Sequence, residues 1–128
     1  MALFASEEWA ELLKDEINAN KEMAKAGKGF DATIQFVIQG AGKRGDLPFW
    51  THMKDGKILE LSTGKKDCEY VVAGDYAVWK EIVEGNQDPL QAIMVKKLTF
   101  EGNMQVIMKY IKAVNLMMES VKNVPTEF

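Results

Sequence analysis

The chain of 128 residues contains one cysteine and one histidine, and each shortage excludes a class of site. With Cys68 alone, no disulfide can form within the chain. No neighbouring residue would lower the pKa of its thiol, so Cys68 is interpreted as a small core residue without a reactive role. With His52 alone, a metal site built from several histidines is excluded. We therefore expect no metal, no cofactor and no catalytic residue.

The chain also lacks a block of basic charge and a long apolar run. Its 16 lysines and arginines are outnumbered by 19 acidic residues, which excludes the basic patch that a nucleic-acid partner needs. Lys109 and Lys112 interrupt the most apolar segment, so no stretch reaches the roughly twenty apolar residues of a membrane span. The first turns carry acidic residues such as Glu7 and Glu8 where a signal peptide needs an apolar run. We expect a cytoplasmic protein whose membrane contact, if any, is transient.

The most informative feature that is present is an apolar segment near the end of the chain. From Asn103 to Val121 the polar residues recur every three or four positions and form one narrow stripe of a predicted helix. The remaining positions provide more apolar surface than one sheet face can bury. Several of them are methionines, which adapt to irregular or changing surroundings. Two interpretations stay open, a deformable lipid site or an ordinary buried helix.

Periodicity and capping residues predict the order of the elements. They are helix 6–27, strands 30–39, 47–54, 57–62 and 68–73, helices 75–85 and 88–94, strand 97–101 and helix 103–121. The four consecutive strands predict an antiparallel meander. The order α-β-β-β-β-α-α-β-α predicts an α+β fold, in which a five-stranded, mainly antiparallel sheet is covered by helices on one face. The length favours one domain over residues 1–128.

Several short motifs lie along these elements. They are Trp50, the Asp55-Gly56 hairpin, Ala73-Gly74-Asp75, the run from Gly85 to Ala92, and Lys97-Leu98-Thr99-Phe100-Glu101-Gly102-Asn103-Met104. In this order they resemble the sterol carrier protein type-two domain family, whose last strand typically ends in a Lys-Leu-x-x-x-Gly-Asn/Asp-Met turn. The resemblance spans about Trp9 to Met118. One departure is Lys96, which stands where family members commonly have a glycine that eases the local backbone conformation.

The resemblance implies an apolar tunnel between the sheet and the helices. It would accept a fatty acyl chain, an acyl-CoA, a phospholipid or a sterol- or isoprenoid-like lipid. The candidate lipid-binding residues are large and apolar, so each could instead simply pack in the core: Phe36, Trp79, Ile82, Ile93, Met94, Phe100, Met104, Met108 and Ile111. A head-group preference would come from charged residues at the mouth, with Lys109 and Lys112, or Lys96 and Lys97, as candidates.

Two other classes of function stay open. In an interaction or scaffold module, Trp9, Leu12 and Leu13 of the first helix would contact a partner, or Met117 and Met118 would form a homodimer. A cavity would distinguish lipid carriage from an interaction module, because an interaction module needs no cavity.

In a small enzyme acting on a lipid, His52 would be the general base. By alternation, however, it shares a strand face with Trp50 and Lys54, opposite Phe49 and Met53, which is typical of a partly exposed strand histidine. We therefore expect a protein that binds and carries a hydrophobic ligand and is not an enzyme.

Overall fold

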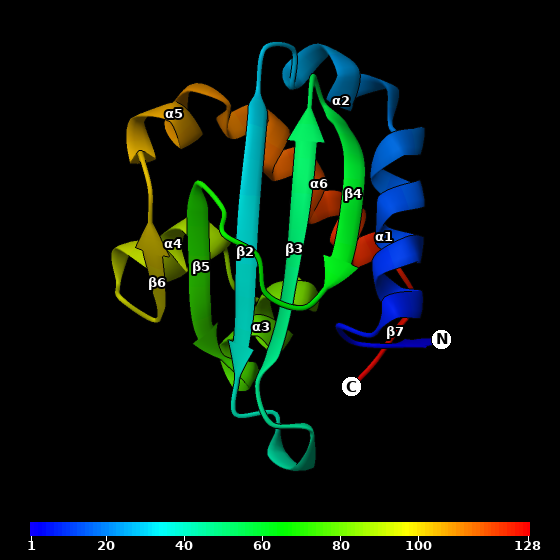
Figure 1. Cartoon of the computed structure of the whole chain (residues 1–128), viewed down its shortest axis with the longest axis vertical. Coiled ribbons are helices and arrows are strands. Elements are labelled where there is room, and N and C mark those ends of the chain that lie inside the picture. The colour runs from blue at the N-terminus through cyan, green and yellow to red at the C-terminus, as the bar shows by residue number, and fades with distance from the viewer.

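The computed structural model describes residues 1–128, and their elements form two layers (Figure 1). In chain order the elements are β1 (Ala2–Leu3), α1 (Glu7–Ala19), α2 (Lys21–Ala26), β2 (Asp31–Gln39), a short 3₁₀ helix η1 (Gly42–Arg44), β3 (Leu47–Lys54), β4 (Lys57–Thr63), β5 (Tyr70–Asp75), α3 (Tyr76–Val83), α4 (Pro89–Met94), β6 (Leu98–Glu101), α5 (Met104–Lys109), α6 (Ile111–Asn123) and β7 (Thr126–Glu127).

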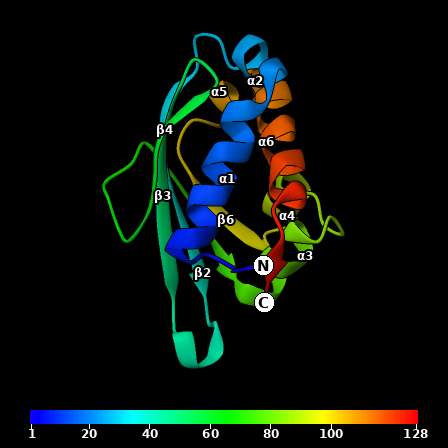
Figure 2. The ribbon, with the colours of Figure 1, turned by 90° about the vertical axis from the view of Figure 1, so that its right-hand side faces the viewer.

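Five of the strands form one sheet in the order β4-β3-β2-β5-β6. Figure 2 shows this sheet nearly edge-on, with the helices gathered against one face, here called the inner face. The 27 buried apolar residues form one connected cluster between the two layers. The predicted α+β fold, with a mainly antiparallel five-stranded sheet covered on one face, is confirmed.

Helix α1 is formed by a cap and an apolar stripe. The Ser6 Oγ accepts a hydrogen bond from the Trp9 N–H at 3.2 Å, and acidic residues follow in the first turn. The prediction of one helix over 6–27 is wrong, because Asn20 divides it into α1 and α2. The Asn20 side chain accepts a hydrogen bond from the Glu22 N–H at 3.0 Å and so caps α2. A side chain that bonds to the backbone in this way competes with continuation of the helix.

The predicted four-strand meander is also wrong, because β5 does not pair with β4. Strands β2, β3 and β4 are a meander, and β5 then returns to the other side of β2, where it runs parallel to it. One reason lies at the free edge of β4. The Asn18 side chain of α1 donates to the Ile58 carbonyl at 3.0 Å and accepts from the Ile58 N–H at 2.8 Å. Asn18 thus takes the edge positions that a further strand would need.

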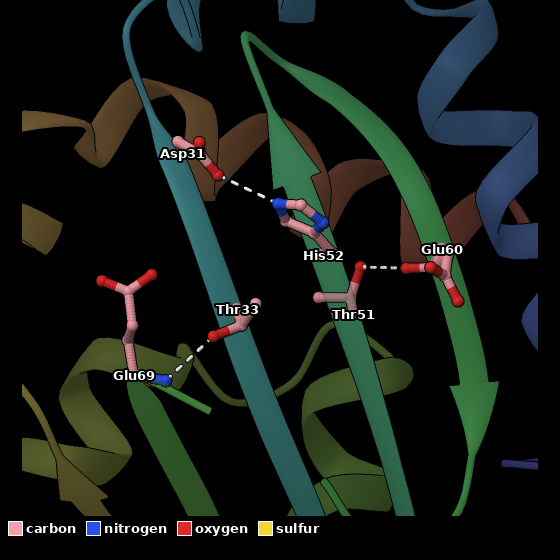
Figure 3. A network of polar contacts seen from close by, with 6 residues as sticks. All are labelled: Asp31, Thr33, Thr51, His52, Glu60 and Glu69. Atoms are coloured by element: carbon pink, nitrogen blue, oxygen red, sulfur yellow. Dashed lines mark hydrogen bonds and ion pairs between the residues drawn. The ribbon is translucent and has the colours of Figure 1, made fainter. Parts of the chain in front are cut away.

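The connection from β4 to β5 crosses the outer face of the sheet and is held there by Gln35 of β2. The Gln35 amide donates to the carbonyls of Phe49 at 2.9 Å and Gly64 at 3.1 Å, and its Oε1 accepts from the Lys66 N–H at 2.7 Å. Gln35 is only 5% exposed. A second anchor is the Thr33 Oγ1, which accepts from the Glu69 N–H at 2.9 Å (Figure 3). The polar face of β2 therefore anchors the crossover.

The apolar helix predicted over 103–121 is divided into α5 and α6. The break is at Tyr110, where φ is −108° and ψ is 29°. The Tyr110 ring stacks on Phe30, which precedes β2, at a centroid distance of 4.7 Å. The prediction of one continuous helix is wrong for this reason, and the side chains of α5 and α6 face different surroundings.

The two ends of the chain are joined, which the sequence did not predict. The Phe4 N–H donates to the Glu127 carbonyl at 2.8 Å, and the Ala2 N–H donates to the Pro125 carbonyl at 3.1 Å. Both ends lie beside α1 (Figures 1 and 2). This pairing places the buried Phe4 ring under α1, where it contacts Trp9 edge-on at 5.0 Å.

The turn after α4 explains why family members commonly have a glycine at the position of Lys96. The Lys96 N–H donates to the Ile93 carbonyl at 3.1 Å and the Lys97 N–H to the Ala92 carbonyl at 2.8 Å. This pattern is a Schellman motif, which needs a left-handed residue at the position of Lys96. Lys96 has a φ of 62°, a conformation that costs a residue with a Cβ about 1 kcal/mol.

We predict that Lys96→Gly raises the free energy of unfolding by about 0.5–1 kcal/mol, because glycine removes the left-handed strain at the cost of a more flexible unfolded chain. Urea unfolding followed by circular dichroism measures the change. Lys97→Gly, at the next exposed position, is the matched control and should not stabilise. Equal or lower stability in Lys96→Gly would contradict the strained turn.

We predict that Gln35→Leu lowers the free energy of unfolding by about 2–3 kcal/mol, because it keeps a side chain of similar size but leaves buried backbone groups of the crossover without partners. Gln39→Leu, at the exposed end of the same strand, should change stability by less than about 0.5 kcal/mol. Urea unfolding compares the two variants, and amide exchange at Lys66 reports the crossover directly. Equal effects of both substitutions would show that the crossover does not depend on Gln35.

Candidate functional site

An apolar cavity of about 80 Å³ lies between the inner face of the sheet and the helices. Of its 15 lining residues 14 are hydrophobic, and they come from the N-terminal segment, α1, β2, β3, β4, α3 and α6. They are Phe4, Trp9, Leu13, Ile17, Phe36, Phe49, Thr51, Ile58, Leu61, Trp79, Ile82, Val83, Met117, Met118 and Val121. The cavity therefore joins segments from both ends of the chain.

The polar groups on the cavity wall all have partners elsewhere. The Thr51 Oγ1 donates to the Glu60 carbonyl at 3.0 Å (Figure 3). The Trp9 indole N–H donates to the Thr126 Oγ1 at 3.0 Å, and that of Trp79 donates to the Val37 carbonyl at 3.2 Å. No buried side-chain nitrogen or oxygen lacks a hydrogen bond. The wall consequently offers a ligand apolar surface and no polar recognition.

The two sides of the cavity differ in the side chains that form them. On the sheet side, Phe36 and Phe49 stack at a centroid distance of 4.9 Å, and Trp9 and Trp79 meet them edge-on at 5.6 and 5.9 Å. Such aromatic pairs have defined geometry. On the helix side, α6 contributes unbranched methionines, which change conformation at little cost. Expansion of the cavity should therefore begin at α6.

Three of the predicted site residues line this cavity: Phe36, Trp79 and Ile82. The structure does not place the other six on its wall: Ile93, Met94, Phe100, Met104, Met108 and Ile111. Met94 and Met108 are 78% and 52% exposed. The break at Tyr110 explains much of the difference, because the predicted apolar sector continues through a helix that in fact changes direction there. A lipid contact by these six residues stays a prediction.

Sequence reasoning missed the contribution of α1 and β4. Of the three candidates for a partner surface, Trp9 and Leu13 are 2% and 5% exposed and line the cavity, whereas Leu12 is 39% exposed and does not line it. Met117 and Met118, the candidates for a dimer surface, also line it. The helical spacing of α1 was a sufficient signal for burial. The pairing of this stripe with β4 could not be read from spacing alone.

The candidate head-group lysines lie on the surface and none lines the cavity. The Lys97 Nζ lies 3.4 Å from the Gln87 Oε1, and the Lys109 Nζ lies 5.5 Å from the Tyr110 ring centroid. A pairing of these lysines with a carboxylate or phosphate stays a prediction.

His52 lies on the sheet face opposite the cavity. Its Nε2 is 3.0 Å from the Asp31 Oδ1, and the two side chains are 33% and 58% exposed (Figure 3). Asp31 is a partner that the sequence analysis did not identify. On β3, Thr51 points to the cavity while the adjacent His52 points away, as alternation requires. A base at this position is separated by the sheet from any ligand in the cavity.

The interpretation of Cys68 as a core residue is wrong, because it lies half-buried before β5 and outside the apolar core; burial nevertheless raises the pKa of its thiol. A raised pKa keeps the thiol protonated at neutral pH and lowers its nucleophilicity, which agrees with the expected unreactive role. No group of three or more histidine, cysteine or acidic side chains is arranged to hold a metal ion. None of the helices has the length and apolarity needed to cross a bilayer.

A sequence profile described as the SCP-2 sterol transfer family matches residues 10–115. A comparison with curated protein sequences finds no match.

Several solved structures share the fold over most of their length. A crystal structure of sterol carrier protein 2 superposes with a TM-score of 0.87 at 20% identity, covering 94% of this chain and 98% of that one. A protein of Thermus thermophilus, described as possibly a sterol carrier protein, gives 0.88 at 20% identity, covering 99% and 93%. The palmitated SCP2L2 of Aedes aegypti gives 0.55 at 16% identity, covering 83% and 92%.

Proposed function

The chain belongs to the SCP-2 sterol transfer family, and from this premise we propose that it binds the apolar part of a lipid between the sheet and α6 and carries it through water. The observation that carries the proposal is the cavity wall, which is apolar and whose polar groups all have partners. A hydrocarbon chain loses no hydrogen bond in such a place, whereas water would gain none.

The size of the cavity favours a single flexible chain over a rigid ring system. Its 80 Å³ compares with roughly 300–1,000 Å³ for pockets that enclose drug-sized ligands. The occupant must therefore displace side chains. A chain can enter segment by segment while Met117 and Met118 change rotamer, but a sterol needs the whole width at once. The palmitate on the Aedes aegypti protein makes palmitate a suitable first probe.

The energetics permit reversible carriage. Burial of a methylene group contributes about 0.8 kcal/mol, so a chain of about sixteen carbons gains on the order of 12 kcal/mol before costs. Association and ordering cost roughly 4–15 kcal/mol, and widening the cavity adds to this. A wall without polar groups discriminates chain length by only about 1–3 kcal/mol per methylene. We therefore propose modest affinity and a range of acceptable chains.

We propose that the lipid enters and leaves the cavity on the side formed by α6. The break at Tyr110 gives α6 one place at which its position can adjust, whereas its other end leads into β7, which is paired with β1. We propose that a transient membrane contact delivers the lipid. We also propose that residues 1–128 form one domain and that the protein is cytoplasmic. A homodimer remains a separate proposal that nothing in the cavity requires.

A non-enzymatic role fits the positions of the reactive side chains. His52 lies on the opposite face from the cavity, and the thiol of Cys68 is held protonated by burial, which raises its pKa. The interaction module receives less support than carriage, because Trp9 and Leu13 are buried within the chain and only Leu12, at 39% exposed, offers apolar surface to a partner.

We predict that Met117→Trp weakens palmitate binding at least about tenfold, because a larger ring fills the space that the chain needs, while the cost of overpacking is about 1–3 kcal/mol. Met108→Trp is the matched control, since Met108 is exposed on α5 and lies off the cavity. Displacement of a fluorescent fatty acid measures affinity, and circular dichroism checks the fold.

Leu61→Phe, on the β4 side of the cavity, provides a second variant if Met117→Trp is unstable. Loss of binding in Met108→Trp with normal binding in both cavity variants would place the lipid at α5 and contradict the proposed site.

A further inference from the structure

A polar groove of about 320 Å³ adjoins the cavity on the side of α3, α4 and α6. The cavity and the groove share two lining residues, Ile82 and Met118. These two side chains are the groove's only hydrophobic residues. A lipid whose chain passes between them would leave its polar end in the groove. The boundary between apolar and polar lining is thus marked by two side chains, one of which is a deformable methionine.

The groove carries charges of both signs without internal pairing. Lys122 provides an ammonium group, and Asp88 and Glu119 provide carboxylates. None of the three lies within ion-pair distance of an opposite charge, since the structure contains one such contact, between His52 and Asp31. One oxygen of Asp88 accepts a hydrogen bond from the Gln91 N–H at 3.1 Å and caps α4. The charges are therefore available to a ligand.

The position of Lys122 depends on a glycine. A Cβ at Gly85 would lie 3.1 Å from the Lys122 Cε and 3.5 Å from its Nζ, so the lysine stem packs on the bare α-carbon. Gly85 also has a φ of 85°, which favours glycine. The turn after α3 thus makes room for the cation at the wall of the groove.

We propose that this groove binds a zwitterionic head group, with a phosphate beside Lys122 and an ammonium beside Glu119 and Asp88, on a single-chain lipid whose chain occupies the cavity. The inference rests on the proposed function. A bare carboxylate fits less well, because it brings one negative charge to a lining that already has two carboxylates and one ammonium group. In a zwitterionic head group, the negative phosphate can pair with the lysine and the positive ammonium with the carboxylates.

The test compares lysophosphatidylethanolamine, which carries a palmitoyl chain, with palmitate, each below its micelle-forming concentration. Wild-type protein should bind the zwitterion more tightly. Glu119→Gln should weaken its binding roughly two- to fivefold and strengthen that of palmitate, because the lost carboxylate attracts an ammonium and repels a carboxylate. Lys122→Gln should weaken both ligands. Lys25→Gln, at an exposed position of α2 outside the groove, is the control.

The outcomes separate this inference from the proposed function. The groove proposal is supported if Glu119→Gln weakens binding of the zwitterion and strengthens binding of palmitate. If none of the groove variants changes the binding of either ligand, or if Lys25→Gln changes it equally, the groove proposal is overturned and the cavity proposal still holds. Failure of the wild-type protein to bind either ligand would instead overturn the proposed function itself. Thermal unfolding of each variant checks that the fold is intact.

Discussion

The structure depends on the burial of one apolar sheet face by helices that come from both ends of the chain. Helix α1 covers β4, and α6 lies beside it, so neither end can leave without exposing the aromatic residues of β2 and β3. The terminal strands join at the same place and hold Phe4 beneath α1. Removing apolar surface from water drives this arrangement, and the small remaining space is what the helices do not fill.

Aromatic rings bound one side of this space and methionines the other, and the proposed function depends on this difference. Stacked and edge-on aromatic rings fix the sheet side. Methionines of α6 form the other side, and the polar groove begins where Met118 ends the apolar lining. A chain that enters can therefore be accommodated without rearranging the sheet. For the same reason the proposed head-group site lies outside the cavity, where its charged groups keep contact with water.

The sequence predicted the elements and the fold class well, because periodicity, caps and turn residues are local. The cap at Ser6 and the break before α4 at Asp88 are examples. Connectivity was predicted less well. The crossing of β4 to β5 depends on Gln35 and Asn18, whose side chains bond to backbone groups 29 and 40 residues away. Amphipathic alternation assigns such residues to a polar face and gives no sign of these partners.

The positions of the candidate residues relative to the cavity were predicted in part, for a related reason. Phe36, Trp79 and Ile82 line the cavity because their elements were correctly placed, whereas the α5 methionines do not lie on it because Tyr110 redirects the chain; lipid binding by all of them stays a prediction. Stacking of Tyr110 on Phe30 is a contact between residues far apart in sequence. The family resemblance supplied the class of ligand, which the spacing of apolar residues alone could not distinguish from an ordinary core.

The central claim is that the cavity holds the chain of a lipid. Native mass spectrometry of the purified full chain, followed by organic extraction, tests it most directly. The account predicts a fraction of molecules that carry one single-chain lipid, and uptake of palmitate or lysophosphatidylethanolamine at one per chain by the remainder. A protein of bare mass that takes up neither lipid, while retaining its folded charge-state distribution, would contradict it.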